Sequence, residues 1–294
     1  MKRVYLIVSL GLCLVLAYSC KKEKYREITD QKERVVQLKQ DNYNKVVCLS
    51  SSMGEWMYKL GLQDKIVGRN SLCNYPEDML QKPDVGMAYL LDTNIIKTLQ
   101  PDLVLAETHI PKKWLDWLEE KGISTVLFRG GNKVSDIYPA LTLLGEVFNK
   151  QSAVENIIKE YKKEIADIEA KPLKPSPRVY FAMRFAGYGG EDITATKDHL
   201  FGDIMRIAGV NNIAKNYKSK SVVRADIVRE DPEYIFVYSK AKEEFLSKPV
   251  YQNMSALKNN KVIGIDKDML LELSPRNLDA IKFIRNTIQS YEEN

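Results

Sequence analysis

The sequence is poor in the residues that most often carry out catalysis or hold metals. It has only two histidines, His109 and His199, and four cysteines in 294 residues. No cysteines form a Cys-x-x-Cys pair and none stands beside a histidine, so a zinc site is not indicated. Glycine-rich phosphate loops and the Gly-x-Ser-x-Gly turn of hydrolases are also absent. With so few ways to assemble a catalytic triad, we expect a binding protein and not an enzyme.

Charge of one sign and long apolar runs are scarce as well. The chain carries 44 Lys and Arg against 39 Asp and Glu, a small and evenly mixed excess that does not indicate a nucleic-acid partner. A mean hydropathy of −0.31 excludes a protein with many membrane spans. With 45% hydrophobic and 28% charged residues, the chain has the composition of one large or two modest globular domains.

The N-terminus departs from these averages. Two basic residues precede an apolar run from Val4 to Ala17, which is shorter than the about 20 residues of a membrane-spanning helix and is typical of a secretory signal. The tetrapeptide Ala17-Tyr18-Ser19-Cys20 resembles a bacterial lipobox, which implies an exported protein anchored through a lipid on Cys20. The periplasmic face is expected if the cell is Gram-negative. The alternative is a short uncleaved anchor.

Two further cysteines, Cys48 and Cys73, remain in the body of the chain. An even pair in an exported protein is compatible with a disulfide. Cys48, however, lies in an apolar run, where buried free cysteine is common. Both alternatives stay open.

Short apolar runs alternate with helix-length segments from residue 45 onward. Strands are predicted at 45–49, 65–68, 102–106, 124–128, 178–183, 234–238 and 261–265. Strands separated by helices are the pattern of βα units with parallel sheets, so the expected fold class is α/β. A helix end, a proline, an acid and a buried strand recur at 99–106 and 230–237, which favours two similar lobes.

One long helix is predicted between the two halves. Apolar residues recur at steps of three and four from Gln151 to Ala170, and three prolines within 171–177 end the pattern. The expected organisation is a signal peptide at 1–19, a lipidated cysteine and tether at 20–33, an N-terminal lobe at 34–148, a bridging helix at 149–172 and a C-terminal lobe at 173–294.

Several motifs follow one another in an order that resembles a known family. They are the strand-turn-helix-strand segment Leu49–Gly68, then Cys73-Asn74-Tyr75-Pro76, Lys82-Pro83-Asp84-Val85-Gly86, and Leu273-Ser274-Pro275-Arg276. The family is the helical-backbone, or class III, substrate-binding proteins, which serve ABC importers of ferric siderophores, haem and cobalamin. The resemblance implies two Rossmann-like lobes bridged by one rigid helix, a ligand cleft between them and limited closure.

In such a fold the ligand lies at the C-terminal ends of the strands. Ser51 and Ser52 follow the first strand and open a helix, whose free N–H groups favour anions, although simple N-capping is the alternative. Tyr75 and Tyr89 lie in loops after the second strand, and Tyr89 is the better cleft candidate. His109 follows the third strand and is either an axial imidazole for haem or a loop residue without a role.

The second half offers cationic candidates. Arg184 and Tyr188 lie in a glycine-containing segment after its first strand, which is the expected specificity loop. Arg224 and Arg276, like Arg69 and Arg129 in the first half, flank other cleft loops. Guanidinium groups bind carboxylates and catecholates, so arginines at a cleft favour an anionic ligand. Most surface arginines are only solvated or ion-paired, and we expect only some of these to touch ligand.

The resemblance implies a permease as partner, with one departure. Family members that dock on a permease usually carry one exposed glutamate per lobe, seven residues before the proline of the Pro–acid–strand motif. The matching positions here hold Asn94 and Ala225. Asp92 and Asp226 lie close by and are candidate substitutes, although a shifted carboxylate on a helix points elsewhere. A lipoprotein that captures ligand without a permease is therefore the alternative.

The ligand expected from these residues is an iron chelate, either a ferric siderophore or haem. Cobalamin is the alternative: Asp268 matches an acid near the corresponding loop of cobalamin-binding relatives, but the three tryptophans lie on predicted helices and not in cleft loops. A monomer with no intrinsic cofactor, no resident metal and no nucleic-acid partner is expected.

Overall fold

The computed structural model of the protein describes residues 25–39, 43–186 and 190–293. Cys20 and Tyr188, two of the predicted functional residues, lie outside them. The first half contains β1 (Tyr25–Thr29), β2 (Val35–Lys39), β3 (Val46–Cys48), α1 (Ser51–Lys59), η1 (Gln63–Lys65), β4 (Ile66–Arg69), η2 (Glu77–Gln81), β5 (Gly86–Met87), β6 (Leu90–Leu91), α2 (Thr93–Leu99), β7 (Leu103–Glu107), α3 (Lys112–Glu120), β8 (Ser124–Phe128), η3 (Val134–Asp136) and α4 (Ile137–Phe148).

The second half begins with the long helix α5 and continues into a second set of strands and helices. Its elements are α5 (Gln151–Glu169), β9 (Arg178–Ala182), β10 (Glu191–Ile193), α6 (Leu200–Ala208), β11 (Asn211–Asn212), β12 (Ser221–Val223), α7 (Arg224–Glu230), β13 (Tyr234–Tyr238), η5 (Ser239–Ala241), α8 (Lys242–Leu246), η6 (Pro249–Tyr251), α9 (Ser255–Lys258), β14 (Val262–Ile265), η7 (Lys267–Met269) and α10 (Arg276–Glu292).

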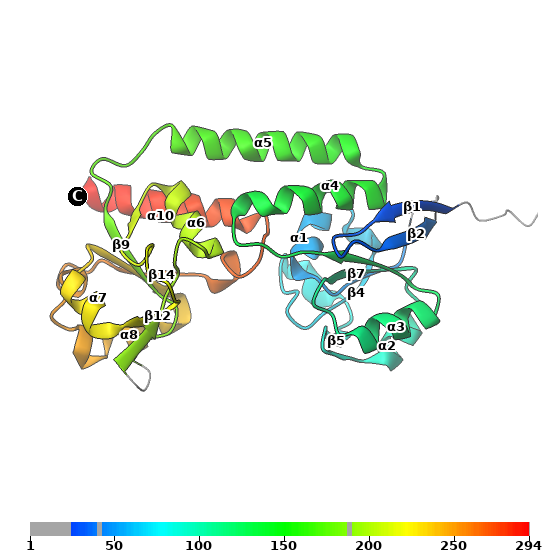
Figure 1. Cartoon of the computed structure of the whole chain (residues 1–294), viewed down its shortest axis with the longest axis horizontal. Helices are drawn as coiled ribbons and strands as arrows, with labels where there is room; N and C mark the ends of the chain where they lie inside the picture. Colours follow the sequence, from blue (N-terminus) through cyan, green and yellow to red (C-terminus); the bar gives the residue numbers. More distant parts are fainter. Residues whose placement is uncertain (1–24, 40–42, 187–189, 294) are drawn as a thin grey trace, which may run out of the picture.

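Two parallel sheets form the two lobes, which lie at opposite ends of the molecule (Figure 1). The N-terminal sheet has the order β4-β3-β7-β8 and the C-terminal sheet the order β11-β9-β13-β14. The strands β3 and β13 are buried at almost every position, because helices cover both faces of each sheet. Successive residues of one strand, such as Val46 and Val47, therefore enter different hydrophobic clusters.

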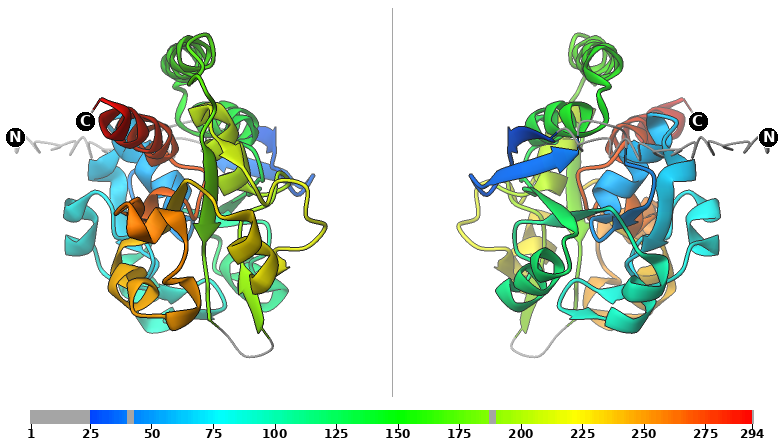
Figure 2. Two further views of the ribbon diagram at one scale, coloured as in Figure 1. Left: turned by 90° about the vertical axis from the view of Figure 1, so that its left-hand side faces the viewer. Right: turned by 90° about the vertical axis from the view of Figure 1, so that its right-hand side faces the viewer.

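One hydrophobic core runs through both lobes. Val46 of β3 and Phe181 of β9 belong to the same buried cluster as Trp56 of α1, Tyr161 of α5 and Ile281 of α10. The helix α5 lies along one edge of the molecule, over α4 and α6, and both end views of Figure 2 show it as the outermost element there. The rings of Trp56 and Tyr161 meet edge to face at 5.9 Å. The opposite face of each sheet has its own smaller core.

The lobes also meet directly, where α1 faces the segment before α10. Trp56 Nε1 donates to the carbonyl of Leu273 at 3.0 Å, and the Ser52 hydroxyl donates to the same oxygen. Beside them Arg276 Nε donates to Glu55 Oε2 at 3.0 Å. The side chains of this ion pair are only 13% and 4% exposed. Because packing and polar contacts both join the lobes at this point, their relative orientation is fixed here as well as by α5.

The structure corrects the tether predicted at 20–33 for residues 25–33, the part that it describes. These residues belong to a folded segment, since β1 pairs with β2 in an antiparallel hairpin. Arg26 Nη2 donates to the carbonyls of Glu146 and Val147 at 2.6 and 2.9 Å, which holds the hairpin against the end of α4. No helix within the described residues is both long and apolar enough to cross a membrane.

The predicted α/β fold is confirmed. The seven predicted strands coincide with β3, β4, β7, β8, β9, β13 and β14, and the helix predicted over 151–170 is α5. The two sheets fall within the predicted lobes, 34–148 and 173–294. Cys48 and Cys73 are buried and free, so no disulfide joins them. The thiol of Cys73 donates to the carbonyl of Cys48 at 3.6 Å.

The ion pair between the lobes yields a stability prediction. Arg276→Ala should lower the free energy of unfolding by about 3 to 5 kcal/mol, because it leaves the Glu55 carboxylate buried without its partner. Urea unfolding measures the change. The matched control is Lys112→Ala, which breaks an exposed pair with Asp116 on α3 and should cost less than about 0.5 kcal/mol. Equal losses for the two variants would contradict a special role for the buried pair.

Candidate ligand-binding site

A pocket of about 390 Å³ opens between the lobes. Its N-terminal wall comes from the loops that follow β3, β4, β7 and β8, at the C-terminal ends of these parallel strands, which is where open α/β sheets bind ligands. Leu200 and the segment Leu271–Leu273 supply the C-terminal wall. The volume lies in the range of small-molecule sites.

Three consecutive serines begin α1 at the pocket, and each has a different role. Ser50 is the N-cap: its hydroxyl accepts from the backbone N–H of Met53 at 3.3 Å and donates to Glu107 Oε1 at 2.5 Å. The hydroxyl of Ser52 is used in the contact between the lobes. The hydroxyl of Ser51 is buried in the pocket wall and has no hydrogen-bond partner among the described residues.

Two carboxyl groups line the pocket from opposite lobes. Glu107 ends β7 and Glu272 precedes α10. Burial raises the pKa of Glu272 to about 7, the negative charges of Glu107 and Glu55 add to this effect, and the backbone N–H of Ser52 and the nearby Ser51 hydroxyl only partly offset it. Burial also raises the pKa of Glu107, against the opposing effects of the Ser50 hydrogen bond and of His109. The polar part of the pocket therefore holds two carboxyls that keep their protons more tightly than exposed glutamates do.

Apolar side chains form the rim of the pocket. Leu72, Tyr89 and Leu271 line it and are 56%, 65% and 54% exposed. The loop with Leu72 is held by Asn70, whose Oδ1 accepts from the backbone N–H groups of Leu72 and Cys73 at 2.7 and 3.0 Å. Exposed large apolar residues around a cavity are typical of a surface that receives an apolar ligand face.

The structure brings four of the predicted site residues together. Ser51, Ser52, Tyr89 and His109 all line the pocket, and His109 lies exposed in the loop after β7. Tyr75 does not line it. The guanidinium of Arg276 lies over the Tyr75 ring, 4.4 Å from its centroid, so this ring supports the contact between the lobes.

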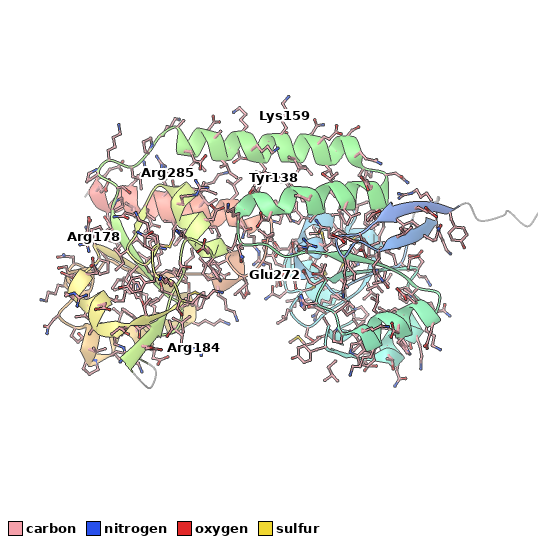
Figure 3. The ribbon with its side chains drawn as sticks, in the orientation of Figure 1. Tyr138, Lys159, Arg178, Arg184, Glu272 and Arg285 are labelled. Carbon is pink, nitrogen blue, oxygen red and sulfur yellow. The ribbon has the colours of Figure 1, made fainter. Side chains whose placement is uncertain are left out.

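The arginines predicted to meet an anionic ligand are placed differently. Arg276 is bound to Glu55, and Arg224 Nε donates to Asp192 Oδ1 at 3.0 Å. Arg184 is exposed at the lower end of the C-terminal lobe, whereas Glu272 lies between the lobes (Figure 3). None of these three arginines lines the pocket: Arg224 and Arg276 are each bound to a carboxylate, and Arg184 is exposed to solvent.

The acids considered for permease docking also have partners within the chain. Asp92 is the N-cap of α2 and accepts from the backbone N–H groups of Asn94 and Ile95 at 2.9 and 3.1 Å. Asp226 on α7 forms an ion pair with Arg229 at 2.7 Å. Asn94 is exposed on the first turn of α2. The two aspartates therefore have structural roles, whatever else they contact.

Sequence reasoning missed the two acids of the pocket. Glu107 ends a buried strand one residue after the predicted end, in the position where a cleft residue is expected, and its place at the end of an apolar run made it detectable. Glu272 has no such signal, because it lies in an irregular segment that only the fold brings to the pocket. Arg129 also lines the pocket, and its Nη2 donates to the carbonyl of Gln31 at 2.9 Å.

Chemically, the pocket is built to hold a ligand through hydrogen bonds and apolar contact. Within the described residues no group of three His, Cys, Asp or Glu side chains is arranged to hold a metal ion.

The raised pKa of Glu272 yields a prediction on stability. A carboxyl that binds its proton more tightly in the folded state weakens folding as the pH rises from about 4.5 to about 7. Glu272→Gln should therefore match the wild type at pH 5 and exceed its free energy of unfolding by about 2 kcal/mol at pH 8. Urea unfolding at several pH values checks this. Glu120→Gln, an exposed change on α3, should show no such divergence.

Comparison with known proteins agrees with this architecture. The family model of periplasmic binding proteins matches residues 46–269. The ABC transporter substrate-binding lipoprotein YvrC of Bacillus subtilis (strain 168) is 24% identical over 269 residues, 89% of this chain and 84% of that protein. The vitamin B12-binding protein of Vibrio parahaemolyticus is 23% identical over 243 residues, 81% of this chain and 86% of that protein.

A solved structure shows the same fold. The periplasmic haem-binding protein HutB of Vibrio cholerae has a TM-score of 0.74 to this chain at 18% identity, over 83% of this chain and 98% of that one. The family model itself covers most of the described residues and both sheets. The chain therefore belongs to the periplasmic binding protein family, whose members bind solutes and are not enzymes.

Proposed function

We propose that this protein is the substrate-binding protein of an ABC importer, anchored to the membrane through a lipid on Cys20, and that its ligand is a corrinoid of the cobalamin type. The ligand sits between the lobes, against the start of α1 and the segment before α10. The protein works as a monomer and releases its ligand to a permease.

The observation that carries the choice of ligand is the pair of carboxyls in the pocket wall. Glu107 and Glu272 line it, and Arg129 is the one guanidinium among the described lining residues. In the protonated form these carboxyls offer no positive charge to the propionates of haem or the catecholates of siderophores, and in the ionised form they repel them. The primary carboxamides around a corrin ring are uncharged and donate hydrogen bonds to carboxyl and hydroxyl oxygens. This reverses the order of ligands expected from the sequence, where the arginines favoured an anionic chelate.

The rim supports the same choice. Leu72, Tyr89 and Leu271 present apolar surface at the mouth of the pocket, while the acids lie deeper. A corrin has a broad, partly apolar ring with polar arms at its edge, so its ring matches the rim and its arms match the wall. The relative from Vibrio parahaemolyticus is named a vitamin B12-binding protein.

Haem is the second candidate, and His109 is the observation that favours it. An exposed imidazole in the pocket wall is a suitable axial ligand for haem iron. The pocket offers the propionates of haem little compensation for its carboxyls, because Arg224 and Arg276 are already paired. For this reason haem ranks below a corrinoid.

Ligand titration tests the proposal. The purified full-length chain in detergent should quench its tryptophan fluorescence with cyanocobalamin at micromolar concentration or below. Hemin and ferric enterobactin should bind at least about 100-fold more weakly, because both bring carboxylate or catecholate charge to an acidic wall. His109→Ala should leave cyanocobalamin affinity within about threefold. Tight hemin binding with a Soret shift that is lost in His109→Ala would instead establish haem as the ligand.

The lipid anchor is tested separately. In cells, Cys20→Ser should abolish incorporation of labelled palmitate and move the protein from the membrane fraction to the soluble fraction, because the acyl chains supply the attachment. Cys73→Ser is the matched control, since Cys73 is buried in the N-terminal lobe and should leave labelling intact. Unchanged membrane attachment of the Cys20→Ser chain would indicate an uncleaved anchor.

A further inference from the structure

Two side-chain atoms in the pocket wall are buried without a hydrogen-bond partner among the described residues. They are Oγ of Ser51 and Oε2 of Glu272. Ser51 comes from the N-terminal lobe and is 9% exposed, and Glu272 comes from the C-terminal lobe. A buried polar atom without a partner destabilises a protein, so two of them on residues that line one pocket indicate partners that the ligand supplies.

The surroundings of Glu272 decide its protonation state. Burial and the nearby carboxyls of Glu107 and Glu55 disfavour its charged form, and the backbone N–H of Ser52 and the neighbouring Ser51 hydroxyl only partly offset this. Arg276, the cation of the contact between the lobes, is bound to Glu55. The titratable and charged groups around the carboxyl are Glu107 of β7, Glu55 of α1 with Arg276 of α10, Cys73 after β4, and His109 and Arg129 in the pocket wall.

We propose that Ser51 and Glu272 form a subsite between the lobes that takes one primary carboxamide of the ligand, with Glu272 in its protonated form. The inference rests on the proposed function and deepens it, because it names the group of the ligand that is recognised and the proton that accompanies binding.

The chemistry follows from donors and acceptors. A protonated carboxyl donates to the amide carbonyl and accepts from one amide N–H, while the Ser51 hydroxyl accepts from the other. An ionised carboxyl has acceptors only, so the amide carbonyl would face an oxygen that cannot donate. A neutral ligand also displaces the water that stabilises the charge. Binding is therefore favoured by the protonated carboxyl and takes up a proton where Glu272 is ionised in the free protein.

The test is a calorimetric titration of the full-length chain in detergent with cyanocobalamin between pH 6.0 and 8.5. The wild-type Kd should rise about tenfold over this range, and that of Glu272→Gln less than twofold. At pH 7.5, buffers of different ionisation enthalpy should reveal proton uptake by the wild type and none by Glu272→Gln. Ser51→Ala should bind severalfold more weakly at every pH with the slope unchanged.

A further variant keeps the test decisive if Glu272→Gln folds poorly. Glu107→Gln removes a negative charge that raises the proton affinity of Glu272, so it should move the midpoint of the pH dependence to lower pH. Glu120→Gln, exposed on α3, should follow the wild type.

The outcomes separate the two claims. A pH slope that is the same in Glu272→Gln, Glu107→Gln and the wild type would overturn the subsite while the corrinoid function stands. If no folded chain binds cyanocobalamin at any pH, the proposed ligand is wrong and the subsite is wrong with it.

Discussion

The contact between α1 and the segment before α10 is the constraint on which the rest of the structure depends. There the Leu273 carbonyl accepts from Trp56 and Ser52, and Arg276 is bound to Glu55 within a mostly buried pair. The hydrophobic core that runs through both lobes lies against the same contact. Separating the two charges of a buried ion pair strongly destabilises the protein, so this contact resists opening.

The same contact shapes the pocket. Glu272 directly precedes Leu273, so the segment that holds the lobes together also carries a carboxyl into the pocket wall. Arg276 is already paired with Glu55, and no described arginine of the C-terminal lobe lines the pocket. The acidity of the site is thus a consequence of how the lobes are joined. A ligand that supplies hydrogen-bond donors and little negative charge fits this wall best.

Most of the fold could be predicted from local pattern. The apolar strands and the periodic helix α5 carry their signal within a few residues, and their burial follows from that pattern. Part of the site followed from one rule, that ligands lie beyond the carboxyl ends of parallel strands, which brought Ser51, Tyr89 and His109 to the pocket. The β1 strand was missed because its partner β2, and not its own composition, makes it a strand.

The partners of the arginines could not be predicted from local pattern. Arg276 meets Glu55 from 221 residues away and Arg224 meets Asp192 across a turn of the lobe, so nothing near either arginine in the chain reveals that it is already paired. By itself the sequence determined the α/β class, the helix between two sheets and the serines and histidine that follow strands, because these depend on short-range periodicity. Only the tertiary structure decided which charges cancel and which remain in the pocket, because charge pairing is a long-range property set by how the two lobes pack.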